Sequence, residues 1–109
     1  MILDFNDIPV RRTDHFKGGD KFYLARMFED DRCKIMHGAL VPGASIGLHT
    51  HDDSCEIISC LSGRGTAVCD GVTETLLPGQ VHYCPKGGSH TLRNDGEEDL
   101  VFVAAVPKQ

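Results

Sequence analysis

Long apolar runs are absent from this sequence, and their absence excludes one large class of proteins. No stretch of the 109 residues approaches the ~20 consecutive apolar residues that a membrane-spanning helix needs. The N-terminal residues also lack the basic start and apolar core of a secretory signal peptide. We therefore expect a cytoplasmic protein with no membrane partner.

A basic patch is absent too. The 11 Lys and Arg are scattered and are outnumbered by 16 Asp and Glu, which gives a formal net charge of −5. Proteins that bind nucleic acid or an anionic membrane surface through charge gather basic residues on one face. We therefore expect no nucleic acid among the partners of this protein.

Paired cysteine motifs are also missing. The five cysteines are odd in number and irregularly spaced, and no Cys-x-x-Cys occurs among them. A disulfide framework is therefore not expected, and reduced thiols that pack as small core residues are the simpler interpretation.

A helical period is absent from every window of ten or more residues, and short strand-like segments recur instead. These segments are rich in Val, Ile, Phe and Tyr, and each is bounded by Gly, Pro, Asp or Asn. The predicted strands are residues 22–29, 33–41, 45–51, 55–61, 65–70, 73–77, 80–84, 89–93 and 99–106. Many short, evenly spaced strands predict an all-β sandwich or barrel.

The chain length suits one domain. Residues 1–20 carry turn residues without a sustained period, so we expect an irregular N-terminal arm there and a single barrel domain over residues 21–109. The strands near 57–61 and 100–106 are apolar on both faces, whereas a strand with one face in water alternates. Either the arm or a second subunit must cover them, and we expect a homodimer with a sheet-on-sheet interface.

Histidine and carboxylate side chains form the clearest chemical pattern. His49 and His51 lie two positions apart, so on an extended strand both imidazoles project from one face, with Cα atoms ~6.5–7 Å apart. Glu56 begins the next predicted strand after a short polar turn and can return a carboxylate to the same rim. His90 follows a turn at residues 85–89 and is the candidate for a fourth metal ligand.

These residues belong to two motifs of fixed spacing. The first, Gly-x5-His-x-His-x4-Glu-x6-Gly, comprises Gly43, His49, His51, Glu56 and Gly63. The second, Gly-x5-Pro-x-Gly-x2-His-x3-Asn, comprises Gly79, Pro85, Gly87, His90 and Asn94. Over residues 43–94 the chain resembles the cupin family, in which both motifs occur in this order.

The resemblance implies a double-stranded β-helix, or jelly-roll, cupin barrel that binds one divalent transition metal. The implied ligands, named here the His–Glu cluster, are His49, His51, Glu56 and His90. Mn, Fe, Ni, Co, Cu and Zn all accept such nitrogen and oxygen ligands. Three neutral imidazoles and one carboxylate leave a divalent ion with one net positive charge, which favours an anionic small molecule. Asn94 is expected to cap its own turn.

Three further residues are candidates for the wall of a pocket. His37, His82 and Tyr83 lie on predicted strands, and strand parity decides which of them face the barrel interior. One β-bulge reverses that parity, so the sequence leaves their direction open.

The functional hypothesis is a metal-dependent enzyme that acts on a small oxygenated anion. Dioxygenase, isomerase or cyclase, lyase and decarboxylase chemistry all fit a metal that polarises a carbonyl or brings substrate and dioxygen together. The alternative is a non-catalytic module that binds or senses a small molecule and keeps a structural metal. No catalytic residue is assigned by the sequence.

Replacing His49 with Ala is expected to remove most of the metal from the purified protein, because the site loses one of its implied ligands. Elemental analysis of the native chain and of the variant measures this directly. A native chain without stoichiometric metal, together with an unchanged metal content in His49→Ala, would contradict the site.

Overall fold

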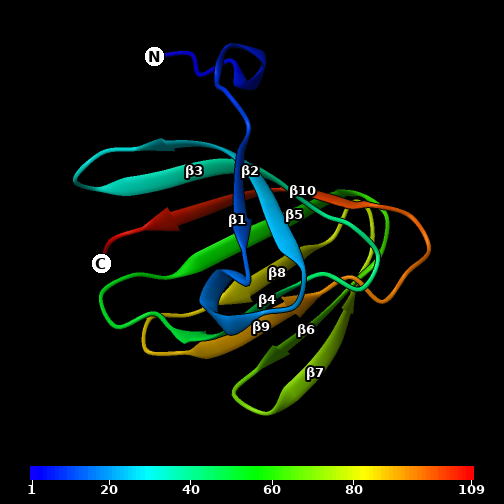
Figure 1. Ribbon diagram of the computed structural model, residues 1–109. Coiled ribbons are helices and arrows are strands. Elements are labelled where there is room, and N and C mark those ends of the chain that lie inside the picture. The colour runs from blue at the N-terminus through cyan, green and yellow to red at the C-terminus, as the bar shows by residue number, and fades with distance from the viewer.

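The computed structural model describes residues 1–109 as two facing antiparallel sheets that close into a jelly-roll barrel (Figure 1). The six-stranded sheet runs in the order β1 (Arg11–Asp14), β2 (Phe22–Glu29), β3 (Cys33–Leu40), β10 (Leu100–Pro107), β5 (Glu56–Ser62) and β8 (Val81–Cys84). The four-stranded sheet runs in the order β4 (Ser45–Thr50), β9 (Ser89–Arg93), β6 (Gly65–Cys69) and β7 (Val72–Leu76). The two helical segments are single 3-10 turns, η1 (Phe5–Asp7) and η2 (Phe16–Gly18), and neither is long or apolar enough to cross a membrane.

All nine predicted strands are present, each with ends within about one residue of the expected position. The arm contains more structure than expected, because β1 pairs with β2 along its whole length. No disulfide forms, and Cys55, Cys60 and Cys84 are buried as small core residues.

The core lies between the two sheets. Along β10 the inward residues Leu100, Phe102 and Ala104 are buried, while the alternate positions are only partly covered. Leu40 and Ile58 complete the same inner layer from β3 and β5. Burial of each large apolar side chain contributes about 1.5–3 kcal/mol, so the inner layer holds the two sheets together around the site.

The arm is anchored to β4 through close contact between backbones. A Cβ atom added at Gly47 would overlap the carbonyl oxygen of Lys17, and one added at Gly19 would overlap that of Ser45. Ser45 fixes the contact further, because its N–H donates to Asp20 O at 3.0 Å and its hydroxyl accepts from Asp20 N at 2.8 Å. The η2 turn therefore lies directly against the strand that carries His49.

The outer face of β5 and β8 stays open in the single chain. Ile57, Leu61, Val81 and Tyr83 are exposed there. The start of the arm lies elsewhere, because the Arg26 guanidinium on β2 donates to the carbonyl oxygens of residues 5 and 8, and Phe5 packs against His37 of β3. The arm therefore covers β2 and β3 and does not cover this apolar face.

Asn94 holds the end of β9 in place, as expected of a turn-capping residue. It is fully buried, its amide nitrogen donates to Leu40 O at 2.7 Å and Glu98 O at 2.8 Å, and its amide oxygen accepts from Gly96 N at 2.8 Å. The side chain thus joins β3, the end of β9 and the following turn.

Replacing Asn94 with Ala is expected to lower the free energy of unfolding by about 3 kcal/mol, because buried carbonyl groups lose their donor. Urea denaturation measures this loss, and the slope of the unfolding free energy against urea concentration should stay unchanged. Asn6→Ala, at an exposed position, is the matched control and should change stability by less than ~0.5 kcal/mol. Equal stability of the two variants would contradict this role.

Candidate metal centre

The four residues of the His–Glu cluster converge from both sheets. His49 on β4 and His90 on β9 are direct register partners in the four-stranded sheet. Glu56 is the first residue of β5 in the six-stranded sheet. The strand β4 ends at Thr50, so His51 is the first residue after it, one position beyond the observed strand end.

The turn of the second motif holds His51 in place. The His51 N–H donates to Gly88 O at 3.0 Å, and the Gly87 N–H donates to His51 O at 2.7 Å. Gly87 has φ of 84°, a left-handed conformation that glycine adopts without strain. Two segments far apart in the sequence are therefore joined through backbone hydrogen bonds next to the cluster.

The ligand atoms of the cluster lie within 4.8 Å of one another. Glu56 Oε1 is 2.8 Å from His90 Nε2, 3.1 Å from His51 Nε2 and 3.7 Å from His49 Nε2. The Nε2 atoms of His51 and His49 are 3.0 and 3.1 Å from His90 Nε2. All three imidazoles thus turn the same nitrogen toward one carboxylate oxygen.

This donor set fits a divalent metal ion. Imidazole nitrogens so close together need a hydrogen or a cation between them, and one cation bound by all three satisfies every pair at once. Two nitrogens bound at ~2.1 Å and at right angles lie ~3.0 Å apart, which agrees with the observed separations. The His49 Nδ1–H donates to Gly47 O at 2.8 Å, so Nε2 of the neutral ring keeps its lone pair for an ion.

Glu56 keeps its negative charge inside the barrel. Burial raises the pKa of its carboxyl group, but the close contacts with the three imidazoles of the cluster outweigh burial and hold the pKa far below the usual range. The carboxylate is therefore ionised throughout the neutral pH range, which a metal ligand requires.

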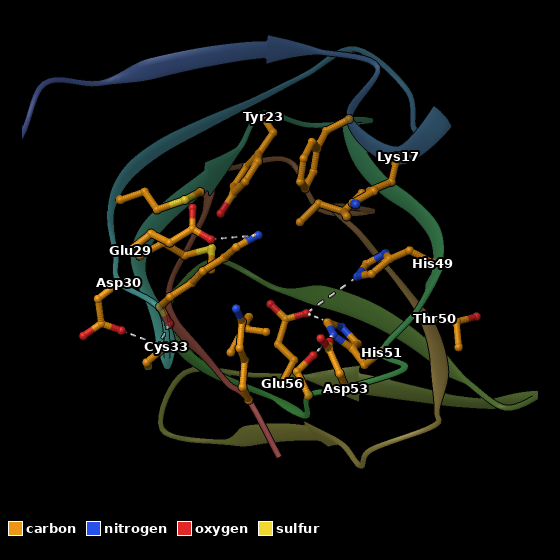
Figure 2. A pocket seen from close by; sticks show the side chains of 18 residues that line it. Lys17, Tyr23, Glu29, Asp30, Cys33, His49, Thr50, His51, Asp53 and Glu56 are labelled. Carbon is orange, nitrogen blue, oxygen red and sulfur yellow. Dashed lines mark hydrogen bonds and ion pairs between the residues drawn. The ribbon is translucent and has the colours of Figure 1, made fainter.

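A cavity of about 260 Å³ opens above the cluster (Figure 2). Its wall includes Phe16 and Lys17 from η2, which the arm's backbone contact with β4 brings to this position. The charged residues of the wall comprise Lys17, Lys34, Lys108, Glu29, Asp30 and Asp53. Lys34 pairs with Glu29 at 3.8 Å, whereas Lys17 and Lys108 form no ion pair.

Tyr23 is a functional candidate in this cavity that the sequence analysis did not identify. It lies on β2, is 2% exposed, and its hydroxyl is the buried side-chain polar atom without a hydrogen-bond partner. Figure 2 shows the hydroxyl directed into the cavity. Burial, together with the charge of Glu56, raises the pKa of Tyr23 far above its usual value, so the hydroxyl remains a donor.

The other three sequence candidates lie outside this cavity. His82 is buried inside the barrel but sits behind His90, and burial, followed by the charge of His90, lowers its pKa. Tyr83, the next residue, points outward and is exposed. His37 packs against Phe5 and lines a separate surface cavity.

Comparison with known proteins agrees with the motifs. A family model described as a cupin domain matches residues 36–106. A protein of Thermotoga maritima named an oxalate-binding protein is 37% identical over 115 aligned positions, which cover 97% of this chain and 93% of the relative.

Solved structures share the whole fold. A Thermotoga maritima structure described as a predicted oxalate decarboxylase has a TM-score of 0.93 and 26% identity, and each chain is covered completely. A sugar phosphate isomerase of the cupin superfamily from Silicibacter pomeroyi has a TM-score of 0.81 and 18% identity, covering 100% of this chain and 76% of that one. At 18% identity, the second similarity concerns the fold alone.

Proposed function

The chain belongs to the cupin domain family, and from that premise we propose that it binds a divalent transition metal at the His–Glu cluster and captures a small dicarboxylate of the oxalate type on it. The observation that carries the proposal is the convergence of three imidazoles and one carboxylate, of which His49, His51 and Glu56 line a cavity. The name of the Thermotoga maritima relative supports the choice of ligand.

Charge and geometry favour a dicarboxylate. The metal keeps one net positive charge after binding Glu56 and three neutral imidazoles, and coordination positions beyond these four ligands can accept two oxygen atoms of one molecule. Oxalate offers two such oxygens in a planar chelate. Lys17 and Lys108 in the wall have no ion-pair partners, so either ammonium group is free to pair with a carboxylate of the ligand. The metal itself can be Mn, Fe, Ni, Co, Cu or Zn.

Tyr23 supplies a hydrogen bond to the ligand in this proposal. Its buried hydroxyl has no partner within the protein, and a buried polar group without a partner is destabilising. An oxygen of the dicarboxylate that does not bind the metal would satisfy it. The hydroxyl would then distinguish a ligand with a further acceptor from a simple monocarboxylate.

Decarboxylation is the second candidate function, because the chain matches the Thermotoga maritima structure described as a predicted oxalate decarboxylase over its whole length at 26% identity. In that reaction the carbon–carbon bond of oxalate breaks, carbon dioxide leaves, and a proton ends on the remaining carbon to give formate. Asp53 lines the cavity two residues after His51, and we propose it as the residue that carries that proton. Bound metal would stabilise the negative charge of the ligand.

Metal-loaded protein is expected to bind oxalate in isothermal titration calorimetry, and metal-free protein is not. Tyr23→Phe should weaken oxalate binding by about 10- to 100-fold, which corresponds to one hydrogen bond to a charged group, while its metal content stays unchanged. The metal-free variant should be as stable as the native chain or more stable, because an unpartnered hydroxyl is removed.

Tyr83→Phe, at the exposed neighbour of His82, is the matched control and should bind oxalate normally. Absence of oxalate binding by the metal-loaded native chain would contradict the proposed ligand. Release of formate and carbon dioxide from oxalate distinguishes the decarboxylase from the binding protein.

We propose that the open apolar face of β5 and β8 is covered by a second copy of the chain. The strand β8 lies at the edge of the six-stranded sheet, where unpaired backbone groups and exposed apolar side chains favour association. Ile57 and Tyr83 are cross-strand partners on this face, and Val81 is exposed beside them.

Light scattering is therefore expected to give a molar mass of about twice the 11.9 kDa of one chain. Val81→Lys should shift the protein toward the single-chain mass, because a charge is placed in an apolar interface. Thr73→Lys, on the exposed strand β7, is the control and should leave the mass unchanged. A single-chain mass for the native protein at micromolar concentration would exclude the dimer.

A further inference from the structure

A chain of side-chain hydrogen bonds leads from the His–Glu cluster to the protein surface. His82 Nε2 lies 3.0 Å from His90 Nδ1, and His82 Nδ1 lies 3.2 Å from Glu74 Oε1. The rings of His82 and His90 are nearly parallel, with 20° between their planes and 5.2 Å between their centroids. The three residues come from β7, β8 and β9 and therefore link both sheets behind the cluster.

Glu74, the last residue of this series, sets the direction of each of its hydrogen bonds. The Glu74 carboxylate only accepts, so His82 Nδ1 carries a hydrogen and donates it. A neutral His82 ring then has a free lone pair on Nε2, which accepts from the Nδ1–H of His90. His90 is thereby left with its lone pair on Nε2, the nitrogen that lies 2.8 Å from Glu56 Oε1 among the other ligand atoms.

His82 and Glu74 differ in their exposure to solvent. His82 is buried, with its side chain 2% exposed, whereas the Glu74 side chain is 57% exposed. Both residues line a second cavity of about 390 Å³, separate from the one above the cluster. Glu74 can therefore be replaced by water if it is removed, whereas His82 Nε2 is the buried acceptor that the structure places against His90 Nδ1.

His90 differs in this respect from the other two histidines. His49 Nδ1 donates to a backbone carbonyl, and His51 Nδ1 contacts the hydroxyl of Ser54 at 3.0 Å. Only His90 has a partner that is itself held by a carboxylate. A histidine ligand whose outer N–H is hydrogen-bonded toward a carboxylate is oriented, and its metal-facing nitrogen is a stronger donor.

We propose that His82 and Glu74 are positioning residues of the metal centre, which hold His90 in the Nδ1–H tautomer and orient its Nε2 toward the metal. Neither residue touches the ion or the ligand cavity. This proposal rests on the proposed metal site, and it adds to that site a support built from strands β7 and β8.

The test is the Zn²⁺ dissociation constant of the full chain, measured by competition with a chromophoric chelator. His82→Phe keeps a planar ring without an acceptor and should bind Zn²⁺ about 10- to 100-fold more weakly than the native chain. Glu74→Gln keeps the shape but not the charge, and we expect a smaller loss of about 3- to 10-fold. Glu97→Gln, at another exposed position, is the charge-matched control and should bind Zn²⁺ like the native chain.

A double-mutant cycle shows whether Glu74 acts on His90 through His82. If Glu74 acts through His82, the combined variant His82→Phe/Glu74→Gln should bind no more weakly than His82→Phe alone. His82→Gln, which keeps an acceptor for His90 and a donor for Glu74, should recover most of the Zn²⁺ affinity. Independent, additive losses or an absence of recovery would overturn the proposal.

The hydrogen bond from His90 Nδ1–H is a readout that a purely structural role would not change. Long-range ¹H–¹⁵N spectra of the Zn²⁺-loaded native chain should show a downfield-shifted, hydrogen-bonded Nδ1–H of His90, and the His82→Phe spectra should lose that shift. A folded His82→Phe with native Zn²⁺ affinity and an unchanged His90 Nδ1–H signal would refute the positioning role. Should that variant fail to fold, the exposed Glu74→Gln decides the question alone. A native chain without Zn²⁺ affinity would refute the metal site itself.

Discussion

A buried carboxylate surrounded by three imidazoles is the interaction on which the rest of this structure depends. Glu56 carries its charge inside the barrel, where an isolated ion would be strongly disfavoured, and the three histidines compensate it from a strand, a turn and a second strand. Because these groups belong to both sheets, the sheets must keep a fixed separation and register at this point. The buried layer around Phe102 and the hydrogen bonds of Asn94 serve this requirement.

The histidines of the cluster are not equivalent, although the motifs treat them alike. The Nδ1 atom of His49 contacts a backbone carbonyl, that of His51 contacts a serine hydroxyl, and that of His90 contacts His82. A backbone partner is fixed by the strand, whereas side-chain partners can change by single substitutions. On the proposed metal site, the donor strength of His90 can therefore be adjusted from β7 and β8 without altering the His–Glu cluster.

The strands and the cluster could be predicted from the sequence, because both depend on local patterns. Turn residues separate the strands, and the fixed spacing of the two motifs identifies the four residues that the structure brings together in the His–Glu cluster. Tyr23 could not be found in this way, since its role depends on the inward face of β2 and on a partner missing from the folded chain. His82 and Tyr83 show the same limit, because these neighbours point to opposite faces and only the pairing of β8 with β5 fixes which one points inward.

The arm meets β4 through glycine backbones and through the hydrogen bond between Asp20 N and the Ser45 hydroxyl. Phe16 also packs against Tyr23, but the attachment does not use the Lys17 side chain, which lines the cavity beside His49. Mutations of Lys17 can therefore remodel the mouth of the cavity while the anchor and the His–Glu cluster remain intact. The fold thus separates the part of the protein that can diversify from the part that must be retained, and new ligand preferences can arise in one short segment.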